Sequence, residues 1–410
     1  MGKMPSARKS FKESYHPTTE VLALMREFMH MTNDCIGIGL ARNATALKRL
    51  SLVSYKELNR YNVPSYYKLC AISKASGILA SRKKSIKRGV PTKASNLGKP
   101  LLVSCYGFKI VSGKVVIPLG NRRFEEIQLT KHAQCILSDP KLKVNSFTLT
   151  ETSLSLCISK DVPLPDKVTG TIGIDRNLRN VCVGNKNAVI YYDMSKIIQI
   201  GETTKDILKS LKRNDVRIRK EICSKYGKRK TERVKRILHA ISKDVVQKAK
   251  ENRQRIVFED IRNIRRMYHK GNYQGKDYRR QMNNHWPFAE IKRQIEYKAQ
   301  WSGVPIIHLT KSETNGTSSL CYQCGERLQG DRSKPRQLWC QKCEKWFDRD
   351  MVAVMNISRR GWLKFDHSPQ KGDAGEAMVQ EPSKEAVILR VDASKSISKS
   401  GQIKFVRQIS

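Results

Sequence analysis

The sequence predicts a multidomain protein of the α+β class. Between residues 101 and 160, short segments rich in β-branched and aromatic residues are separated by Gly, Pro and Asn, which is the pattern of antiparallel strands. From residue 170 onwards, apolar strands alternate with long helical stretches, as in a sheet covered by helices. The chain has 410 residues, and at about 150 residues per domain this length suggests two or three domains.

The first hundred residues are predicted to be mainly helical. Residues 17–50 and 64–80 carry apolar side chains at helical spacing, and a threonine stands at the start of the first stretch as a helix cap. A basic stretch over residues 82–99 contains no acidic residue, and its glycines and prolines predict a loop. The strands over 101–160 that follow indicate a small barrel or sandwich.

The second half of the chain has the pattern of an α/β layer. Three apolar segments between residues 170 and 194 predict strands, and RIVFEDI and VPIIHLT predict two more. The helical region 203–253 carries 18 Lys and Arg against 6 Asp and Glu, so one of its faces is strongly positive. MVAVMNISRRGWLK predicts a further helix. The tail over 366–410 is rich in Ser, Lys, Gly and Gln and is expected to be disordered, although AVILRV and IKFVRQI have the composition of pairing strands.

The charge of the chain indicates a polyanionic partner. The sequence has 79 Lys and Arg against 37 Asp and Glu, a formal net charge of +42, whereas solubility alone needs a net charge of about 2–8. Nucleic acid is the leading candidate because each neutralised phosphate releases a counterion. An anionic membrane surface is the alternative, but no run of about 18 apolar residues is present, so we expect no membrane partner. The start of the chain also shows no apolar secretory signal.

Four clustered cysteines predict a structural zinc site. Cys321 and Cys324 form one CxxC pair, and Cys340 and Cys343 form a second, with fifteen residues between the pairs. Four thiolates satisfy the tetrahedral preference of Zn²⁺ and close its coordination shell to water, so the site is structural rather than catalytic. A redox dithiol is the alternative, but redox chemistry needs only one such pair.

Three acids stand where a cation would be needed. Asp175 and Glu259 end apolar strands, and Asp350 lies at the start of a helix. A carboxylate at the tip of a buried strand is costly unless a cation shares the site, and three carboxylates from separate elements can hold two Mg²⁺ ions for phosphodiester hydrolysis. Each acid could instead be a strand-end cap or an ion-pair partner. Asp260 and Asp348 compete with Glu259 and Asp350 for the same roles, because neighbours on a strand point to opposite faces.

Taken together, these motifs resemble the transposon-encoded TnpB family. The resemblance is carried by GIDRNLRNVCV, VFEDI, WPFAEIKRQIEYKAQWSGVPIIHL, TSSLCYQCG and DRDMVAVMNI. It covers residues 170–362 closely and the first 165 residues more loosely. Members of this family are RNA-guided DNA nucleases, and similar proteins gave rise to the type V CRISPR effectors.

The resemblance implies a domain plan and a site. It implies an RNase H-like (RuvC) α/β nuclease domain with an inserted zinc ribbon, a β-barrel wedge and a helical recognition lobe. The implied bounds are 1–16 and 100–168 for the wedge, 17–99 for the recognition domain, 169–318 and 346–365 for the nuclease domain, and 319–345 for the ribbon. Asp175, Glu259 and Asp350 match the catalytic, metal-binding acids, with Mn²⁺ as a substitute for Mg²⁺.

The resemblance also implies partners and a place of action. These are a noncoding guide RNA and double-stranded target DNA, with no small-molecule substrate, in a prokaryotic cytoplasm next to the nucleoid. The basic residues that are candidates for nucleic-acid contacts are Arg82, Lys83, Lys84, Lys87, Arg88, Arg265 and Arg266. Two features depart from the family pattern. Arg176 directly follows the first acid, and Asp350 is followed by Met351, Val352, Ala353 and Val354, where the family commonly has one residue and then Asn-Ala-Ala.

Three other functions are left open by the residues alone. A guided DNA-binding repressor would bind without cleaving. A transposase of the DDE type would join strands and need no RNA. A zinc-ribbon RNA-binding module would carry out no chemistry at all.

Overall fold

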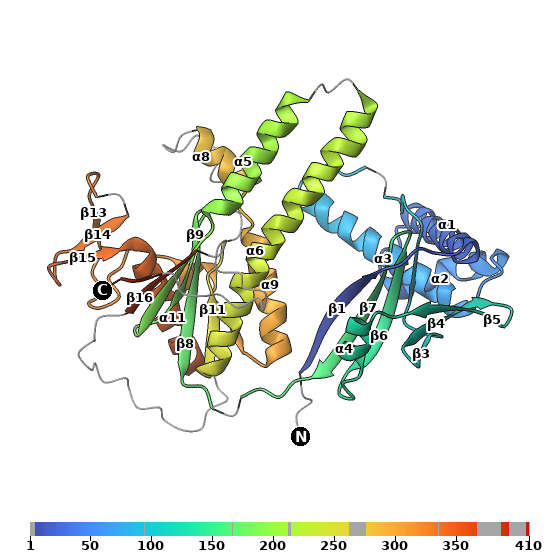
Figure 1. The fold of residues 1–410 in the computed structure, drawn as a ribbon, viewed down its shortest axis with the longest axis horizontal. Helices are drawn as coiled ribbons and strands as arrows, with labels where there is room; N and C mark the ends of the chain where they lie inside the picture. Colours follow the sequence, from blue (N-terminus) through green and yellow to red (C-terminus); the bar gives the residue numbers. More distant parts are fainter. Residues whose placement is uncertain are drawn as a thin grey trace. The chain divides into compact units, whose positions relative to one another are not determined.

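The computed structural model describes residues 5–93, 95–165, 167–211, 215–261, 276–334, 336–366, 387–392 and 407–409 (Figure 1). The chain divides into two compact units, one formed by residues 6–161 and the other by residues 162–410 together with the first five residues. Within the described residues, no helix is both long enough and apolar enough to cross a bilayer.

The first unit contains two antiparallel sheets. One has the order β1-β7-β6-β2 and the other the order β3-β4-β5. Their strands are β1 (Ser6–Ser14), β2 (Leu101–Ser104), β3 (Lys109–Val111), β4 (Lys114–Gly120), β5 (Arg123–Gln128), β6 (Lys143–Thr150) and β7 (Ser153–Asp161). A short helix, α4 (Lys131–Leu137), follows β5. Antiparallel pairing over 101–160 is as the sequence predicts, and β1 adds a strand from the start of the chain.

Helices pack against these sheets to form one core. They are α1 (Thr19–Ala41), α2 (Leu47–Ser54), the 3₁₀-helix η1 (Lys56–Arg60) and α3 (Ser65–Lys87). Thr18 caps α1 by accepting a hydrogen bond from the N–H of Val21. Buried side chains of the helices, such as Phe28 and Tyr67, join Phe147 of β6 in a single apolar cluster. The helices lie where apolar spacing predicts them, with a break after Ala41.

The basic stretch over 82–99 is a loop only in part: residues 90–93 and 95–98 have no regular secondary structure, as predicted, whereas the stretch begins as a helix. α3 continues to Lys87, so Arg82, Lys83 and Lys84 lie on its last turns. Gly89, two residues after the last helical residue, has a left-handed φ of 72° and terminates the helix. The N–H groups of Gly89 and Val90 bond back to the carbonyls of Ile86 and Ser85. Nothing upstream of this glycine breaks a helix, and cations are favourable at a helix C-terminus because of its dipole.

The second unit contains a seven-stranded mixed sheet with the order β12-β11-β8-β9-β10-β16-β17. Its strands are β8 (Gly170–Arg176), β9 (Asn180–Gly184), β10 (Ala188–Asp193), β11 (Gln254–Phe258), β12 (Ile306–His308), β16 (Val387–Asp392) and β17 (Arg407–Ile409). Neighbours from β8 to β10 are antiparallel, whereas β11 is parallel to both β8 and β12. The first three strands therefore form a meander, and the chain returns to the edge of β8 through helical crossovers.

Helices lie on both faces of this sheet. They are α5 (Ser195–Ser210), the π-helical η2 (Ile218–Ile222), α6 (Cys223–Glu251), α8 (Lys276–Asn284), α9 (Phe288–Ser302), α10 (Lys311–Thr314) and α11 (Arg349–Asp366). Figure 1 shows α5 and α6 as neighbouring long helices. Ile237 and Ile241 of α6 pack with Ile172 and Ile174 of β8 and with Phe258 of β11. α11 lies on the opposite face and contacts β8, β9 and β11.

The close approach of α11 to β8 requires a glycine. A Cβ atom at Gly173 would lie 2.3 Å from the carbonyl oxygen of Val354 and 2.8 Å from the backbone nitrogen of Ser358. The Oγ1 of Thr171 and the Oγ of Ser358 lie 2.9 Å apart across the same contact. This contact holds the middle of α11 against β8.

Part of the tail that was expected to be disordered is a strand. β16 pairs in parallel with β10 over six residues, and β17 pairs with β16. Val391 is buried in the core with Tyr192 of β10. β16 satisfies the backbone groups that β10 would otherwise expose at an edge, which accounts for the pairing that AVILRV and IKFVRQI allowed. Residues 367–386 and 393–406 lie outside the described part of the chain.

Candidate metal centres

Asp175, Glu259 and Asp350 converge on one face of the sheet. Alternation along β8 places Asp175 on the same face as Gly173, against α11. Alternation along β11 places Glu259 on the same face as Val257, which packs with Ile357 of α11. Asp350 lies in the first turn of α11. Three elements that are distant in sequence therefore bring their carboxylates to the same end of the sheet.

Two of the three acids are buried, and the third is largely shielded from solvent. Asp175 is 9% exposed and Asp350 is 4% exposed, and the side chain of Glu259 is 14% exposed. Burial, followed by the charges of Glu259 and Asp350, raises the pKa of Asp175 well above its usual range. Burial also raises the pKa of Glu259, against the opposing charge of Arg176. A cation bound between these carboxylates would stabilise their ionised forms.

The competing acids have different positions. Asp348 caps α11, because its Oδ1 accepts hydrogen bonds from the N–H groups of Asp350 and Met351 at 2.9 and 3.1 Å. The same oxygen accepts a bond from the Tyr191 hydroxyl at 2.8 Å. Asp260 follows Glu259 and, by alternation, points to the opposite side; its backbone N–H donates to Thr314. The geometry favours Glu259 and Asp350 as the members of the cluster.

Two arginines of the chain already neutralise part of this charge. The Nε of Arg176 lies 3.9 Å from the Oε1 of Glu259, and the guanidinium of Arg336 pairs with Asp350. Arg336 comes from the cysteine-rich segment, and its side chain is 54% exposed. The guanidinium of Arg336 thus lies where a cation is favoured, beside Asp350. The atoms that could coordinate a metal ion here are carboxylate oxygens, which are the ligands that Mg²⁺ prefers. The residues present fit a divalent cation.

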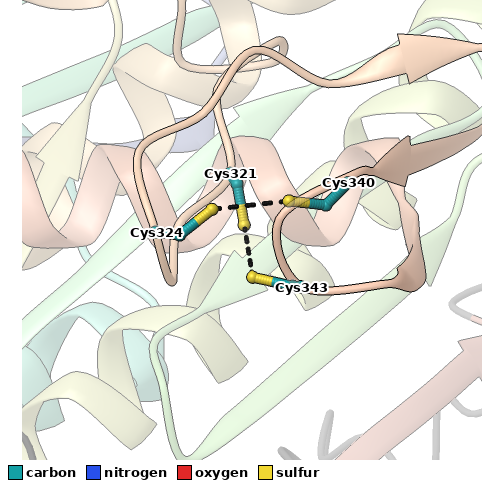
Figure 2. A group of neighbouring side chains, drawn as sticks. All are labelled: Cys321, Cys324, Cys340 and Cys343. Atoms are coloured by element: carbon teal, nitrogen blue, oxygen red, sulfur yellow. Dashed lines mark hydrogen bonds between the residues drawn. The ribbon is translucent and has the colours of Figure 1, made fainter.

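The four cysteines gather as their spacing predicts. The Sγ atoms of Cys321, Cys324, Cys340 and Cys343 all lie within 4.8 Å of one another. Figure 2 shows the sulfur atoms converging from two turns. The shortest separations are 3.4 Å between Cys324 and Cys340 and 3.9 Å between Cys321 and Cys343. In the part of the chain that the structure describes, no other group of three or more His, Cys, Asp or Glu side chains is gathered as compactly.

A small sheet supports the cysteine cluster. It consists of β13 (Gln329–Gly330), β14 (Gln337–Cys340) and β15 (Lys345–Asp348). Burial opposes ionisation of Cys324, but the backbone N–H of Glu326 and the other thiols lower its pKa to about 7. Burial raises the pKa of Cys321. Ionisation is therefore favoured at Cys324 and opposed at Cys321.

The basic residues proposed for nucleic-acid contact lie on the first unit where they are described. A groove of about 680 Å³ runs along α3, and Arg82 lines it. Its lining consists of Cys70, Ser73, Lys74, Gly77, Ile78, Ser81, Arg82, Ser85, Thr92, Ser95, Val103 and Cys105. Arg82 Nε and Thr92 Oγ1 are buried atoms without a hydrogen-bond partner. Arg265 and Arg266 lie outside the described residues.

Three polar residues at the acid cluster were not predicted from the sequence. Arg336 contacts Asp350, and Asn177 and Asn180 donate hydrogen bonds to Asp175 and Asp350. The two asparagines stand beside Asp175 in GIDRNLRN, so their proximity in sequence was an available signal. Arg336 carried no such signal, because only the folded β14–β15 hairpin brings it to Asp350.

Comparison with known proteins places these clusters in context. The family model "Cas12f1-like, TNB domain" matches residues 288–357, a segment that contains the four cysteines and Asp350. A TnpB-like protein of Methanocaldococcus jannaschii is 29% identical over 268 residues, covering 62% of this chain and 92% of the relative. A second TnpB-like protein of that organism is 26% identical over 316 residues, covering 75% of this chain and 71% of the relative. These matches confirm the resemblance to the TnpB family.

A solved structure is also similar. It is described as the mini-RNA-guided endonuclease CRISPR-Cas_phi3, and it covers 90% of this chain and 94% of its own at 10% identity. Its TM-score is 0.38, which is too low to establish a common fold.

Proposed function

From the premise that the chain is a TnpB-like protein, we propose that it is an RNA-guided DNA endonuclease encoded by a transposon. It binds a noncoding guide RNA, recognises a short DNA motif beside the target and hydrolyses phosphodiester bonds of the target DNA. The observation that carries this proposal is the convergence of Asp175, Glu259 and Asp350, three buried carboxylates from separate elements, on one face of the mixed sheet.

The proposed catalytic site is RuvC-like, in an RNase H-like domain. The antiparallel meander followed by parallel strands, with helices on both faces, supports this assignment. Asp175, Glu259 and Asp350 would hold two Mg²⁺ ions, or Mn²⁺ in their place. When bound, such ions activate a water molecule and stabilise the leaving 3′ oxygen. The chain itself keeps the carboxylates on one face and excludes bulk water by burying them.

The proposed role of the four cysteines is structural. Cys321, Cys324, Cys340 and Cys343 would hold Zn²⁺ as thiolates in a closed tetrahedral shell. The ion would fix the two turns from which the β13–β15 sheet extends. Since β15 runs directly into α11, zinc would also fix the entry to the helix that carries Asp350.

The positive charge is the proposed means of holding RNA and DNA. A net charge of +42 offsets two polyanions at once. In the first unit, which we assign to wedge and recognition roles, the hydroxyl-rich groove with Lys74 and Arg82 suits a phosphate backbone. In guided effectors generally, pairing between RNA and DNA supplies most of the sequence specificity, while the protein reads shape and a short motif. We propose the same division here, at the nucleoid of a prokaryotic cell.

The test is programmable cleavage. The protein is purified with its RNA, the RNA is sequenced, and a plasmid library carrying a matching target with variable flanks is incubated with the complex and Mg²⁺. We expect one structured RNA with a variable end and cleavage that follows that end when it is rewritten. Binding without cleavage at any Mg²⁺ or Mn²⁺ concentration would identify a guided repressor instead. A heterogeneous RNA mixture with untargeted binding would refute guide dependence.

A further inference from the structure

The turn from β8 to β9, together with the residue on either side of it, contacts all three acids of the proposed site. Arg176 is the last residue of β8, Asn177 lies in the turn, and Asn180 is the first residue of β9. We propose that these three residues are positioning residues, each of which orients a different carboxylate for metal binding. This inference rests on the proposed nuclease function, because it assigns a role toward the metal ions of that site.

The two asparagines form a relay between Asp175 and Asp350. Asn177 Nδ2 donates to Asp175 Oδ2 at 2.8 Å and to Asn180 Oδ1 at 3.2 Å. Asn180 Nδ2 donates to Asp350 Oδ2 at 3.2 Å. These hydrogen bonds fix the orientation of both side-chain amides. A neutral amide can hold a carboxylate oxygen in place without carrying the positive charge that would compete with a metal ion.

Arg176 fixes the third acid. Its backbone N–H donates to Glu259 Oε1 at 3.3 Å. Its guanidinium donates to the carbonyl of Glu259 at 3.3 Å and to the carbonyl of Phe288 at 3.0 Å. Arg176 is 4% exposed and lies over the ring of Phe258. The arginine therefore ties the end of β11 to the start of α9, and this explains why a bulky cation is tolerated directly after Asp175.

The backbone of the turn is held in place by hydrogen bonds and by a buried side chain, so its polar groups keep fixed positions relative to the acids. The N–H of Asn177 bonds to the carbonyl of Asn180 at 2.9 Å, and the N–H of Met194 bonds to the carbonyl of Arg179 at 2.6 Å. Leu178 is buried among Ile198, Met282 and Trp286. Because the backbone of the turn is fixed on two sides, its side chains present donors in constant positions.

The relay differs from the Arg336 contact in what happens when a cation arrives. Arg336 is a charged group on a half-exposed side chain, and a divalent ion at Asp350 would compete with it directly. Asn180 is neutral and contacts Asp350 from the sheet side of the site. We therefore assign to Asn180 the role of keeping Asp350 oriented in both the metal-free and the metal-bound protein.

The experiment measures metal affinity apart from catalysis. Mn²⁺ is titrated into the purified protein–RNA complex without DNA, and bound ions are counted by electron paramagnetic resonance. Loss of a partner that orients a metal ligand costs about 10–100-fold in affinity, so we expect Asn180→Ala and Asn177→Ala to weaken Mn²⁺ binding in that range. The melting temperature should remain that of the wild type.

The matched control is Asn185→Ala. Asn185 is an amide at the end of the neighbouring hairpin, where it donates to the carbonyl of Thr171, and its loss should leave Mn²⁺ affinity unchanged. Wild-type Mn²⁺ affinity in both Asn177→Ala and Asn180→Ala would overturn the positioning role and leave the nuclease proposal standing. Retention of both Mn²⁺ binding and guided cleavage in Asp175→Ala would instead overturn the nuclease site itself. If Asn180→Ala does not fold, Asn177→Ala and Asp175→Ala decide between these outcomes.

Discussion

The cysteine cluster and the acid cluster lie in the same unit but are built in opposite ways. The four cysteines fall within 321–343, and two local turns bring their sulfur atoms within 4.8 Å of one another. The three acids fall between 175 and 350, and a sheet and a helix bring them together. The cysteines are close neighbours in two turns, whereas burial and the charges of Glu259 and Asp350 raise the pKa of Asp175, and two arginines pair with Glu259 and Asp350. The difference predicts which cluster needs a metal ion to fold and which needs it only to act.

Breaking the cysteine cluster should have the largest effect. Apparent zinc-binding free energies at structural sites are about 10–16 kcal/mol, so a ribbon that loses a ligand loses most of its stability. We expect Cys340→Ser to lose bound zinc, measured by elemental analysis, and to lose target cleavage by more than about 100-fold. Cys135→Ser, at an exposed cysteine of α4, is the control. Full cleavage by a zinc-free Cys340→Ser protein would show that the ribbon is dispensable.

Neutralising the acid cluster should instead stabilise the metal-free protein. The pKa of Asp175 is raised on folding. The contribution of this carboxyl group to the free energy of unfolding is therefore complete below its unfolded-state pKa and is lost as the pH rises through its folded-state pKa. Asp175→Asn has no ionisable group at this position, so its stability does not fall in this way. Without Mg²⁺, we expect its melting temperature at pH 8 to exceed that of the wild type by about 2–4 °C, the shift that 1 kcal/mol gives in a domain of this size.

The difference in melting temperature should vanish near pH 4 and shrink when Mg²⁺ is added to the wild type. A variant that is less stable than the wild type at pH 8 would contradict the picture of mutually repelling carboxylates.

Removing Arg336 should change the melting temperature and the metal affinity less than the substitutions above. The substitution tests whether the arginine side chain competes with a bound metal ion at Asp350. Without this partner, Asp350 keeps its burial but loses its opposite charge. We expect Arg336→Gln to lower the metal-free melting temperature and to raise Mn²⁺ affinity several-fold, as measured by titration. Arg332→Gln, at another arginine of the ribbon, is the control. Weaker Mn²⁺ binding in Arg336→Gln would mean that the arginine supports the ion instead of competing with it.

The smallest effect is expected in the first unit, which holds neither cluster. If Arg82 contacts a phosphate in the groove along α3, Arg82→Ala should reduce the salt dependence of RNA binding by about one counterion. Filter binding over a series of salt concentrations measures this slope. Lys114→Ala is the control, because Lys114 is paired with Glu126 on β5. Equal slopes for both variants would remove Arg82 from the interface.

Local patterns predicted some parts of the molecule well and long-range contacts decided the rest. The CxxC pairs predicted their own cluster because the ligands lie on two tight turns. The acids could be proposed from strand ends, but choosing Glu259 over Asp260 needed the face that β11 presents to α11. The extension of α3 beyond residue 80 was missed, because the helix continues until Gly89 terminates it. The composition of AVILRV allowed a strand in the tail, but its partner, the open edge of β10, could not be read from the sequence.

The comparison of Glu259 with its neighbour tests the central claim most directly. Glu259→Gln removes a carboxylate from the cluster while keeping its size, and Asp260→Asn makes the same change one residue away on the opposite side of the strand end. Guided cleavage of a matched plasmid with Mg²⁺ is measured for both. We predict that Glu259→Gln loses cleavage by more than the 10–100-fold cost of an outer-shell partner, with RNA and DNA binding intact, and that Asp260→Asn keeps it. Cleavage that survives Glu259→Gln, or is lost only in Asp260→Asn, would contradict the assignment of the catalytic acids.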